Sequence, residues 1–239
     1  MTVVEVVGLG VTRGDFTLGP VDLTVGPGIT AILGPNGSGK STLLRAMNGL
    51  IPGARGRTWV GDEDLMLRTS ETLERVAFVP DTEELLFSEM QLHEYWSFVA
   101  TVRQRTFDED PRRILARAEG FAERLGLQPG RRRIREFSMG MRRKAQLITG
   151  LMVEPQVLIV DEPQNGLDFV SANEVRAIFT RMSDEGRSVI MSNHDLDSVA
   201  RMADRLVVLR RGQVVGRSDD RFESGSECEA FVAGFFERA

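Results

Sequence analysis

The sequence of 239 residues predicts an α/β fold: a core with a mainly parallel sheet, an N-terminal antiparallel β subdomain and an inserted α-helical lobe. Three observations lead to this prediction. Short β-branched runs alternate with helical patterns on both sides of the chain's middle, a glycine-rich loop joins one such run to a helix, and residues 83–154 carry helical patterns alone. Alternation of strands and helices favours parallel strands, because each helix returns the chain to the same edge of the sheet.

The N-terminal part is rich in strand signals. Residues 2–8 and the alternating apolar side chains between Phe16 and Val25 indicate strands, with Gly19-Pro20 as punctuation. A short strand is expected around Trp59-Val60, and a buried strand over Val76–Val79 is stopped by Pro80. We assign these strands to the β subdomain and to the start of the core.

The chain is expected to form one domain, residues 1–239, in three parts. Residues 1–82 and 155–217 alternate strands and helices and form the core, and residues 83–154 form the helical lobe. Residues 218–239 form a tail whose short helix packs an apolar face on the core. In the lobe, one helical face is expected to comprise Leu92, Tyr95, Trp96, Val99 and Val102, and the next runs from Ile114 to Leu125.

The glycine-rich loop reads Gly34-Pro35-Asn36-Gly37-Ser38-Gly39-Lys40-Ser41-Thr42 and fits the pattern G-x-x-x-x-G-K-[ST]. It follows the strand-like run Ile29–Leu33 and precedes a helical run that ends at Gly49. Its glycines let backbone N–H groups surround phosphate oxygens, and the helix dipole adds positive potential. In this pattern Lys40 reaches the outer phosphates and the Ser41 hydroxyl holds Mg²⁺. The loop therefore predicts a bound nucleoside triphosphate.

A second motif places two carboxylates at the end of a buried strand. The apolar run Val157–Val160 is followed directly by Asp161 and Glu162. Ligands of open α/β sheets bind at this end of the strands. Asp161 is suited to supporting Mg²⁺, and Glu162 is suited to polarising the water that attacks a phosphate.

Residues 2–215 resemble the ATP-binding subunit of ABC transporters, because further motifs follow in the order of that family. Phe137-Ser138-Met139-Gly140-Met141 resembles the signature Leu-Ser-Gly-Gly-Gln, and Asn165-Gly166-Leu167-Asp168 resembles the loop that crosses to the opposite subunit. Ser192-Asn193-His194-Asp195 resembles the switch histidine, and residues 203–214 resemble the closing strand pair.

The resemblance implies an ATPase in which two chains close around two ATP molecules. Ser138 and Gly140 begin a helix and would meet ATP held by the second ATP-binding subunit, in a homodimer or a heterodimer. Asp168 would lie in the crossing loop, and His194 would donate to the γ-phosphate. A lone histidine is more often structural, but His194 lies between a predicted strand and an acidic residue, and this context favours a catalytic role. Glu162 and Lys40 are expected to be the other catalytic residues.

The sequence departs from the family pattern at several positions. Asp81 stands where the family has a Gln that reaches Mg²⁺, and we expect a contact with the metal through water. Met139 and Met141 replace common signature residues, in a version that resembles exporter-type members. Arg13 stands where a Tyr would cover adenine, and Phe16 is close by. Either could stack on the base, and core packing is the alternative for Phe16.

Two further stretches bear on partners. Leu85-Leu86-Phe87 to Trp96 resembles the groove that receives a helix of the membrane subunit, with Phe87, Tyr95 and Trp96 as floor residues or, alternatively, as lobe core. The runs Arg131–Arg133 and Arg142–Lys144 are expected to be solvated faces, with a phosphate or lipid role as the alternative.

Composition narrows the function further. The net charge of −5 disfavours an extended grip on nucleic acid, and the single Cys228 excludes an internal disulfide and fits a reducing cytosol. No signal peptide is visible, and no run approaches the ~18 apolar residues of a membrane span. We expect a cytoplasmic protein held at the inner face of the membrane through a permease.

The function expected is an ATP-hydrolysing subunit that powers transport, in the direction of export, through a separate integral-membrane permease. A soluble ABC ATPase of DNA repair is a rival, but such proteins carry long coiled-coil insertions between the two motifs. A translation-associated ABC protein usually holds two cassettes in one chain. A regulatory module that binds ATP with little turnover stays open because of Asp81 and Met141.

Overall fold

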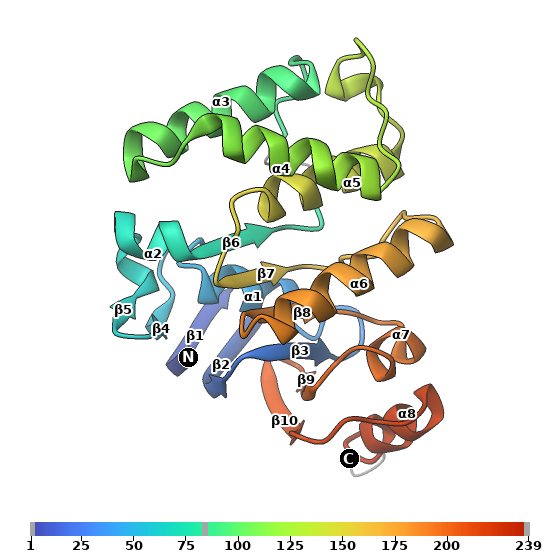
Figure 1. Cartoon of the computed structure of the whole chain (residues 1–239). Helices are drawn as coiled ribbons and strands as arrows, with labels where there is room; N and C mark the ends of the chain where they lie inside the picture. Colours follow the sequence, from blue (N-terminus) through green and yellow to red (C-terminus); the bar gives the residue numbers. More distant parts are fainter. Residues whose placement is uncertain (1–2, 83–85, 237–239) are drawn as a thin grey trace.

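A computed structural model describes residues 3–82 and 86–236 and contains two sheets (Figure 1). The larger sheet has six strands in the order β10-β9-β3-β8-β7-β6. Its five neighbouring pairs are parallel except for β9 and β10, which form an antiparallel hairpin at one edge. The strands are β3 (Gly28–Leu33), β6 (Val76–Val79), β7 (Val157–Val160), β8 (Ser188–Ser192), β9 (Arg205–Arg210) and β10 (Gln213–Ser218).

The central strands of this sheet are buried on both faces. Every residue of β3 is buried, and its side chains alternate between two separate cores. Ile29, Ala31 and Leu33 face the core that also contains the lobe helices, whereas Ile32 faces a core shared with the smaller sheet. Burial on both sides explains why these strands are continuous apolar runs. The predicted α/β fold with a mainly parallel sheet is confirmed.

The smaller sheet has four antiparallel strands in the order β2-β1-β4-β5. They are β1 (Val4–Arg13), β2 (Phe16–Val25), β4 (Arg55–Val60) and β5 (Glu63–Asp64). Gly19-Pro20, which the sequence marks as punctuation in this β pattern, lies inside β2. Because β2 is an edge strand and its pairing with β1 shifts register nearby, a proline without an N–H is tolerated there.

The helical lobe contains three long helices, α3 (Leu92–Phe107), α4 (Pro111–Arg124) and α5 (Met139–Leu151), with the 3-10 turn η3 (Ile134–Glu136) before α5. They lie together at the top of the view in Figure 1, beyond the edge strand β6. Asp110 caps α4 by accepting from the N–H of Arg112, and Pro111 fits the first turn because no N–H is needed there. The predicted face of α3 is correct except for Val102, which is 45% exposed.

The remaining helices surround the larger sheet and the C-terminal end. They are α1 (Lys40–Met47), η1 (Leu65–Leu67), α2 (Ser70–Arg75), α6 (Phe169–Asp184), α7 (Leu196–Ala200) and α8 (Gly225–Ala233). The tail packs on the core as expected, because Phe231 and Val232 contact buried residues and the Phe231 ring lies 5.2 Å from that of Phe235. Among the residues described, the helices are too short or too polar to cross a bilayer.

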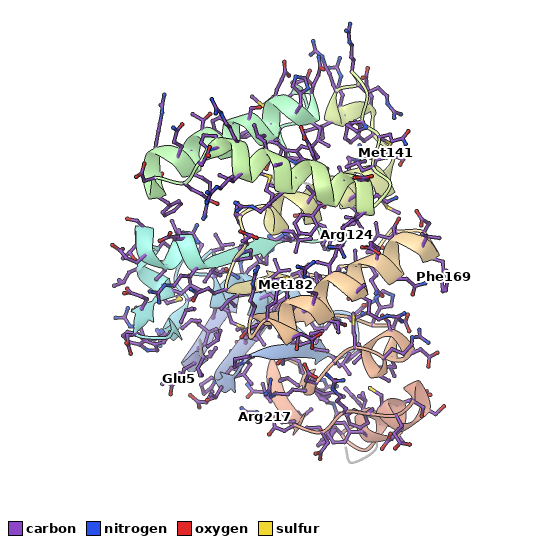
Figure 2. All side chains as sticks on the ribbon, viewed as in Figure 1. Glu5, Arg124, Met141, Phe169, Met182 and Arg217 are labelled. Atoms are coloured by element: carbon purple, nitrogen blue, oxygen red, sulfur yellow. The ribbon has the colours of Figure 1, made fainter. Side chains whose placement is uncertain are left out.

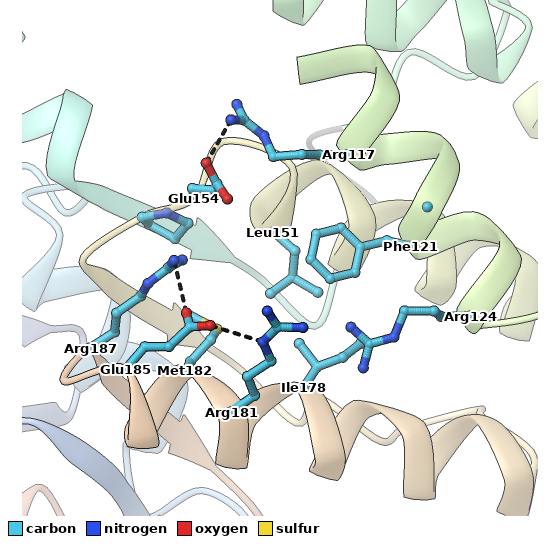
Figure 3. Close-up of a pocket in the computed structure, with 12 residues that line it drawn as sticks. Arg117, Phe121, Arg124, Leu151, Glu154, Ile178, Arg181, Met182, Glu185 and Arg187 are labelled. Atoms are coloured by element: carbon cyan, nitrogen blue, oxygen red, sulfur yellow. Dashed lines mark hydrogen bonds and ion pairs between the residues drawn. The ribbon is translucent and has the colours of Figure 1, made fainter. Parts of the chain in front are cut away.

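A cavity of about 250 Å³ separates α4 of the lobe from α6 of the core (Figure 3). Leu151, Phe121 and Ile178 contribute apolar surface to it. The guanidinium groups around it pair with carboxylates, since Arg117 contacts Glu154 at 2.6 Å and both Arg181 and Arg187 contact Glu185 at 2.9 Å. A further pair between Arg124 and Glu174, at 2.6 Å, joins α4 to α6. The Arg124–Glu174 pair thus ties the lobe to the core beside this apolar seam.

Candidate active site

A cleft of about 610 Å³ opens where several parallel strands end. Each loop that contributes to it follows the carboxyl end of one strand: β3, β6, β7 or β8. In an open α/β sheet this edge is where ligands bind. The lining residues are Phe16, Asn36, Gly37, Gly39, Lys40, Ser41, Thr42, Asp81, Glu162, Asn165 and His194.

The phosphate loop depends on glycine at its first position. Gly34 has φ of 154°, and a Cβ there would lie 2.2 Å from the carbonyl oxygen of Leu209. The loop leads into α1, and the buried ammonium of Lys40 donates back to the carbonyls of Gly34 at 2.9 Å and Pro35 at 3.4 Å. The hydroxyl of Ser38 is buried and has no hydrogen-bond partner among the described residues. A buried donor without a partner is costly, so an anionic ligand fits this loop.

The two carboxylates that follow β7 have different environments. Asp161 is 1% exposed, and its Oδ1 accepts a hydrogen bond from the Ser192 hydroxyl at 2.5 Å. The same hydroxyl accepts from the N–H of Glu162 at 2.9 Å. Ser192 ends β8, the neighbour of β7, and its role was missed because the sequence does not state which strands are neighbours. One hydroxyl therefore fixes the backbone and side chain of successive acidic residues.

Glu162 and His194 form a pair at the mouth of the cleft. Nδ1 of His194 lies 2.8 Å from Oε2 of Glu162, across a sequence separation of 32 residues. The Glu162 side chain is 16% exposed and that of His194 is 68% exposed, so the carboxylate lies deeper than the ring. The sequence placed these residues on separate motifs, and the fold brings them together.

Asp81 lies in the loop after β6. It is exposed and lines the cleft, and its Oδ1 accepts a hydrogen bond from Nδ2 of Asn165 at 3.1 Å. Asn165 belongs to a motif that was identified, but its place in this cleft was not predicted. The side chain of Asp81 is thus held by a hydrogen bond from Asn165, which belongs to a loop distant in sequence.

The two residues predicted to stack on adenine, Phe16 and Arg13, differ in whether they line the cleft. Phe16 lines the cleft and packs so closely on Gly39 that a Cβ there would lie 2.6 Å from its ring. Phe16 is also half-buried against the smaller core, so packing and cleft lining coexist. Arg13 pairs with Phe16 across the β1–β2 ladder, but it is exposed and is not among the residues that line the cleft.

Three further predicted nucleotide residues lie outside this cleft, at the starts of two helices. Ser138 caps α5 by accepting from the N–H of Met141 at 3.3 Å, and a Cβ on Gly140 would lie 2.7 Å from the carbonyl oxygen of Gly166. Asp168 caps α6, whose Ser171 N–H donates to it at 2.8 Å. Hydrogen bonds from the Ser171 backbone and hydroxyl, with Lys144 adding a smaller effect, lower the pKa of Asp168 to about 2.

The prediction for the run Arg142–Lys144 is wrong at its middle residue. Arg143 is 4% exposed and is not part of a solvated face. Its guanidinium donates to backbone carbonyls at the ends of β6 and β7, which compensate for the loss of water. The local sequence does not indicate that this arginine is buried, because burial of its side chain depends on packing between distant segments.

The residues predicted to form the groove for the membrane subunit differ in burial. Leu85 lies outside the described residues, and Leu86 is buried. Tyr95 and Trp96 are each 5% exposed and belong to the lobe core, so the core alternative holds for them. Phe87 is 50% exposed, and its ring packs at 5.5 Å against that of Phe98, which is 45% exposed. His93 is exposed.

The described residues contain no cluster of three or more histidine, cysteine, aspartate or glutamate side chains that could hold a metal alone. Mg²⁺ usually takes one or two carboxylates together with substrate phosphates and water. The buried Asp161 carboxylate and the exposed Ser41 hydroxyl at the cleft fit that type of site, because a buried charge gains from a nearby cation.

Comparison with known proteins agrees with this geometry. A family model described as ABC transporter matches residues 18–165. The energy-coupling factor transporter ATP-binding protein EcfA2 of Symbiobacterium thermophilum is 35% identical over 226 residues, covering 91% of this chain and 77% of that protein. The sulfate/thiosulfate import ATP-binding protein CysA of Mesorhizobium japonicum is 32% identical over 211 residues, covering 87% and 60%. Across the curated relatives compared, the match spans 55% to 84% of their own lengths.

A solved ATP-binding subunit of an ABC transporter has the same fold. It superposes with a TM-score of 0.80 at 23% identity and covers 97% of this chain and 99% of that one. The comparison confirms the predicted phosphate-loop core with its β subdomain and inserted helices.

Proposed function

The chain belongs to the ABC transporter family, and we propose that it is the ATP-hydrolysing subunit that drives export through a separate membrane permease. Its relatives are ABC-type ATPases that power transport through separate membrane components. The direction is supported by Met141 in the signature, which resembles exporter-type members. CysA is named for import, so direction needs its own test. ATP-dependent accumulation of a substrate inside inverted vesicles, with the chain and its permease, is expected; accumulation in right-side-out vesicles would contradict export.

The observation that carries the proposal is the cleft in which the phosphate loop faces the Glu162–His194 pair. Lys40 and the loop N–H groups bind the phosphates of ATP, and Glu162 orients and deprotonates the attacking water. His194 holds the Glu162 carboxylate at 2.8 Å and lies at the mouth of the cleft. Ser41 and Asp161, with Asp81 through water, would hold Mg²⁺, which would neutralise charge on the phosphates.

The proposal is tested by the rate of phosphate release from ATP. Glu162→Gln keeps the size of the side chain and removes the base, so turnover should fall at least roughly 100-fold while ATP binding survives. Glu154→Gln is the matched control, because this glutamate is half-exposed and pairs with Arg117 outside the cleft. Near-normal turnover of Glu162→Gln, assayed with any required permease, would contradict the assignment.

A second ATP-binding subunit is the proposed partner at the starts of α5 and α6. Met139, Phe169 and Val170 are 60%, 81% and 75% exposed and gather next to Ser138 and Asp168 (Figure 2, where Phe169 is labelled). Exposed apolar side chains beside helix N-termini support a surface that a partner covers. We propose that Ser138 and Gly140 meet ATP bound by the other subunit, and that Asp168 keeps the crossing loop in place.

The permease is proposed to dock on the exposed aromatic side chains of the lobe. Phe87, Phe98 and Val102 are 50%, 45% and 45% exposed, and Phe87 and Phe98 pack against each other. An apolar surface of this kind suits a short amphipathic helix. Docking would hold the chain at the cytoplasmic face of the membrane. Phe87→Arg should abolish co-purification with the permease and leave ATP binding unchanged; unaltered co-purification would place the docking surface elsewhere.

The proposed domain division follows the same elements. Residues 1–82 and 155–217 form the core with the β subdomain, residues 83–154 form the lobe, and residues 218–239 form the tail. The apolar seam between α4 and α6 supports a boundary there, since few charged contacts join the two parts across it. Limited proteolysis should separate the lobe from the core before it cuts within the core.

A further inference from the structure

Arg143 is a buried arginine, 4% exposed, on the second turn of α5. Its guanidinium lies among oxygen atoms from two separate chain segments. Nη1 donates to the carbonyl of Pro80 at 2.6 Å, and Nη2 donates to those of Asp161 at 2.5 Å and Glu162 at 2.9 Å. Longer contacts join Nε to the carbonyl of Pro163 at 3.4 Å and Nη1 to Oε1 of Gln146 at 3.3 Å.

These carbonyls follow two neighbouring strands. Pro80 comes directly after β6 and precedes Asp81, whereas Asp161 and Glu162 come directly after β7. One planar group therefore bridges the two strand ends from which the cleft carboxylates project. An ammonium could not do the same, because a lysine offers its donors from a single atom and a guanidinium offers a rigid fork.

Glu162 needs such support more than its neighbours do. Its φ is 47°, in the left-handed region that a residue with a side chain occupies at a cost. Hydrogen bonds on both sides of the residue oppose that cost: its N–H donates to Ser192, and its carbonyl accepts from Arg143 and from the N–H of Asn165. The backbone of the proposed base is thus held from both sides.

The charge of Arg143 is also in place. Burial lowers the pKa of Arg143 to about 10, and the nearby carboxylates of Asp81, Asp161 and Glu162 act in the opposite direction. The guanidinium is therefore cationic at neutral pH, and it lies close to the acidic residues Asp81, Asp161 and Glu162.

We propose that Arg143 is a positioning residue for ATP hydrolysis: it bridges the ends of β6 and β7 and so holds the carboxylate of Glu162 toward the cleft. It acts through Glu162 and does not touch the nucleotide. This inference rests on the proposed role of Glu162. Because Arg143 lies on α5, five residues after Ser138, the same helix that begins with the signature fixes the catalytic strand ends.

The first test separates turnover from nucleotide binding. Arg143→Gln keeps a polar side chain but loses the charge and the fork, so kcat should fall at least ~10-fold, as small misplacements of reacting groups do. The KM for ATP should change by less than ~3-fold, since the phosphate loop is untouched. Arg143→Lys keeps the charge and fewer hydrogen bonds, and its kcat should lie between those of the wild type and Arg143→Gln.

Arg103→Gln is the matched control. Arg103 is also buried, at 9% exposed, and it pairs with Glu109 at 2.9 Å and stacks on Phe107 within the lobe. Its loss should lower the melting temperature and leave kcat per folded molecule unchanged. If Arg143→Gln behaves as Arg103→Gln does, Arg143 contributes to stability alone and the proposal is wrong.

A double substitution tests whether Arg143 acts through Glu162. In the Glu162→Gln background the base is already absent, so Arg143→Gln should reduce the residual rate by less than ~2-fold. An undiminished ~10-fold loss there would overturn the proposal. An active Glu162→Gln single variant would instead refute the proposed function, so the two failures are distinguishable. If Arg143→Gln does not fold, Arg143→Lys is measured in its place, both alone and in the Glu162→Gln background.

Discussion

At the residue scale, the acidic end of the cleft is organised by contacts that cross between neighbouring strands. Ser192 joins Asp161 to the backbone of Glu162, and His194 holds the Glu162 side chain. Each of these contacts replaces part of the hydration that a carboxylate loses on burial. The result is one deep carboxylate suited to a cation and one shallower carboxylate suited to a water molecule.

Asp81 is the residue at which a change should reveal a metal contact. We expect Asp81→Ala to require more Mg²⁺ for half-maximal ATPase activity, because a carboxylate oxygen attracts this hard cation even through water. Nucleotide affinity without metal should stay the same. The measurement is an Mg²⁺ titration of ATPase rate.

Asp81→Asn is the control for this titration, because it keeps an acceptor for Asn165 Nδ2 and removes the charge. It should resemble Asp81→Ala if the charge matters. Superimposable titrations of all three proteins would leave Asp81 as a polar loop residue that orders Asn165.

At the element scale, two helix starts carry most of the signature chemistry. Ser138 caps α5 and Asp168 caps α6, and Lys144 of α5 lies 3.3 Å from the Asp168 carboxylate. Both caps satisfy N–H groups that the helix itself leaves without partners. The pair of helices therefore presents two adjoining N-termini on one surface, which adds their positive potentials there.

Asp168→Ala should destabilise the protein at neutral pH by about 0.5–1 kcal/mol, the lower part of the range for a lost N-cap, since this carboxylate is exposed and screened. The pKa of Asp168 is lowered from 3.8 to about 2. The stabilisation is therefore present above pH ~4 and is lost as the pH falls toward ~2. Thermal unfolding of both proteins across this pH window measures it.

Asp168→Asn should retain most of the neutral-pH stability, because asparagine also caps helices. Its stability should no longer change through the titration of this side chain. Equal stability of Asp168→Ala and the wild type would mean that the cap contributes nothing measurable, and a loss of ATP-driven dimers without loss of stability would instead favour a role at the nucleotide.

At the scale of the whole molecule, the cleft is only half of the proposed ATP site. The residues that line it come from the core and the β subdomain, whereas Ser138 and Gly140 lie outside it. The exposed Phe169 and Val170 lie beside those helix starts. A second subunit that covers this surface would bring one chain's signature to the other chain's phosphate loop.

Ser138→Arg should block ATP-driven dimerisation, because the added bulk and charge occupy the surface where the phosphates would lie. In the Glu162→Gln background, light scattering should show dimers with ATP for the parent and monomers for this variant. Nucleotide binding through Lys40 should remain. Ser97→Arg, on an exposed face of α3, is the control and should still dimerise. Unchanged dimers of Ser138→Arg would argue against a signature shared between subunits.

The features that depend on adjacent residues could be predicted from the sequence. The phosphate loop from Gly34 to Thr42 joins β3 to α1 as predicted, with Lys40 to Thr42 already in the helix, because its glycines, its strand and its helix are encoded within a short segment. The acids after β7 and the caps of α5 and α6 follow from local pattern in the same way. Burial on both faces made the central strands readable as continuous apolar runs.

Which of these local segments come into contact depends on the tertiary structure. The strand order β3-β8-β7-β6 brings Ser192 to Asp161 across 31 residues and Arg143 to Pro80 across 63. It also buries Tyr95 and Trp96 while leaving Phe87 exposed. No local pattern encodes these outcomes, because the free energy of burying an arginine or exposing a phenylalanine depends on side chains that distant segments supply.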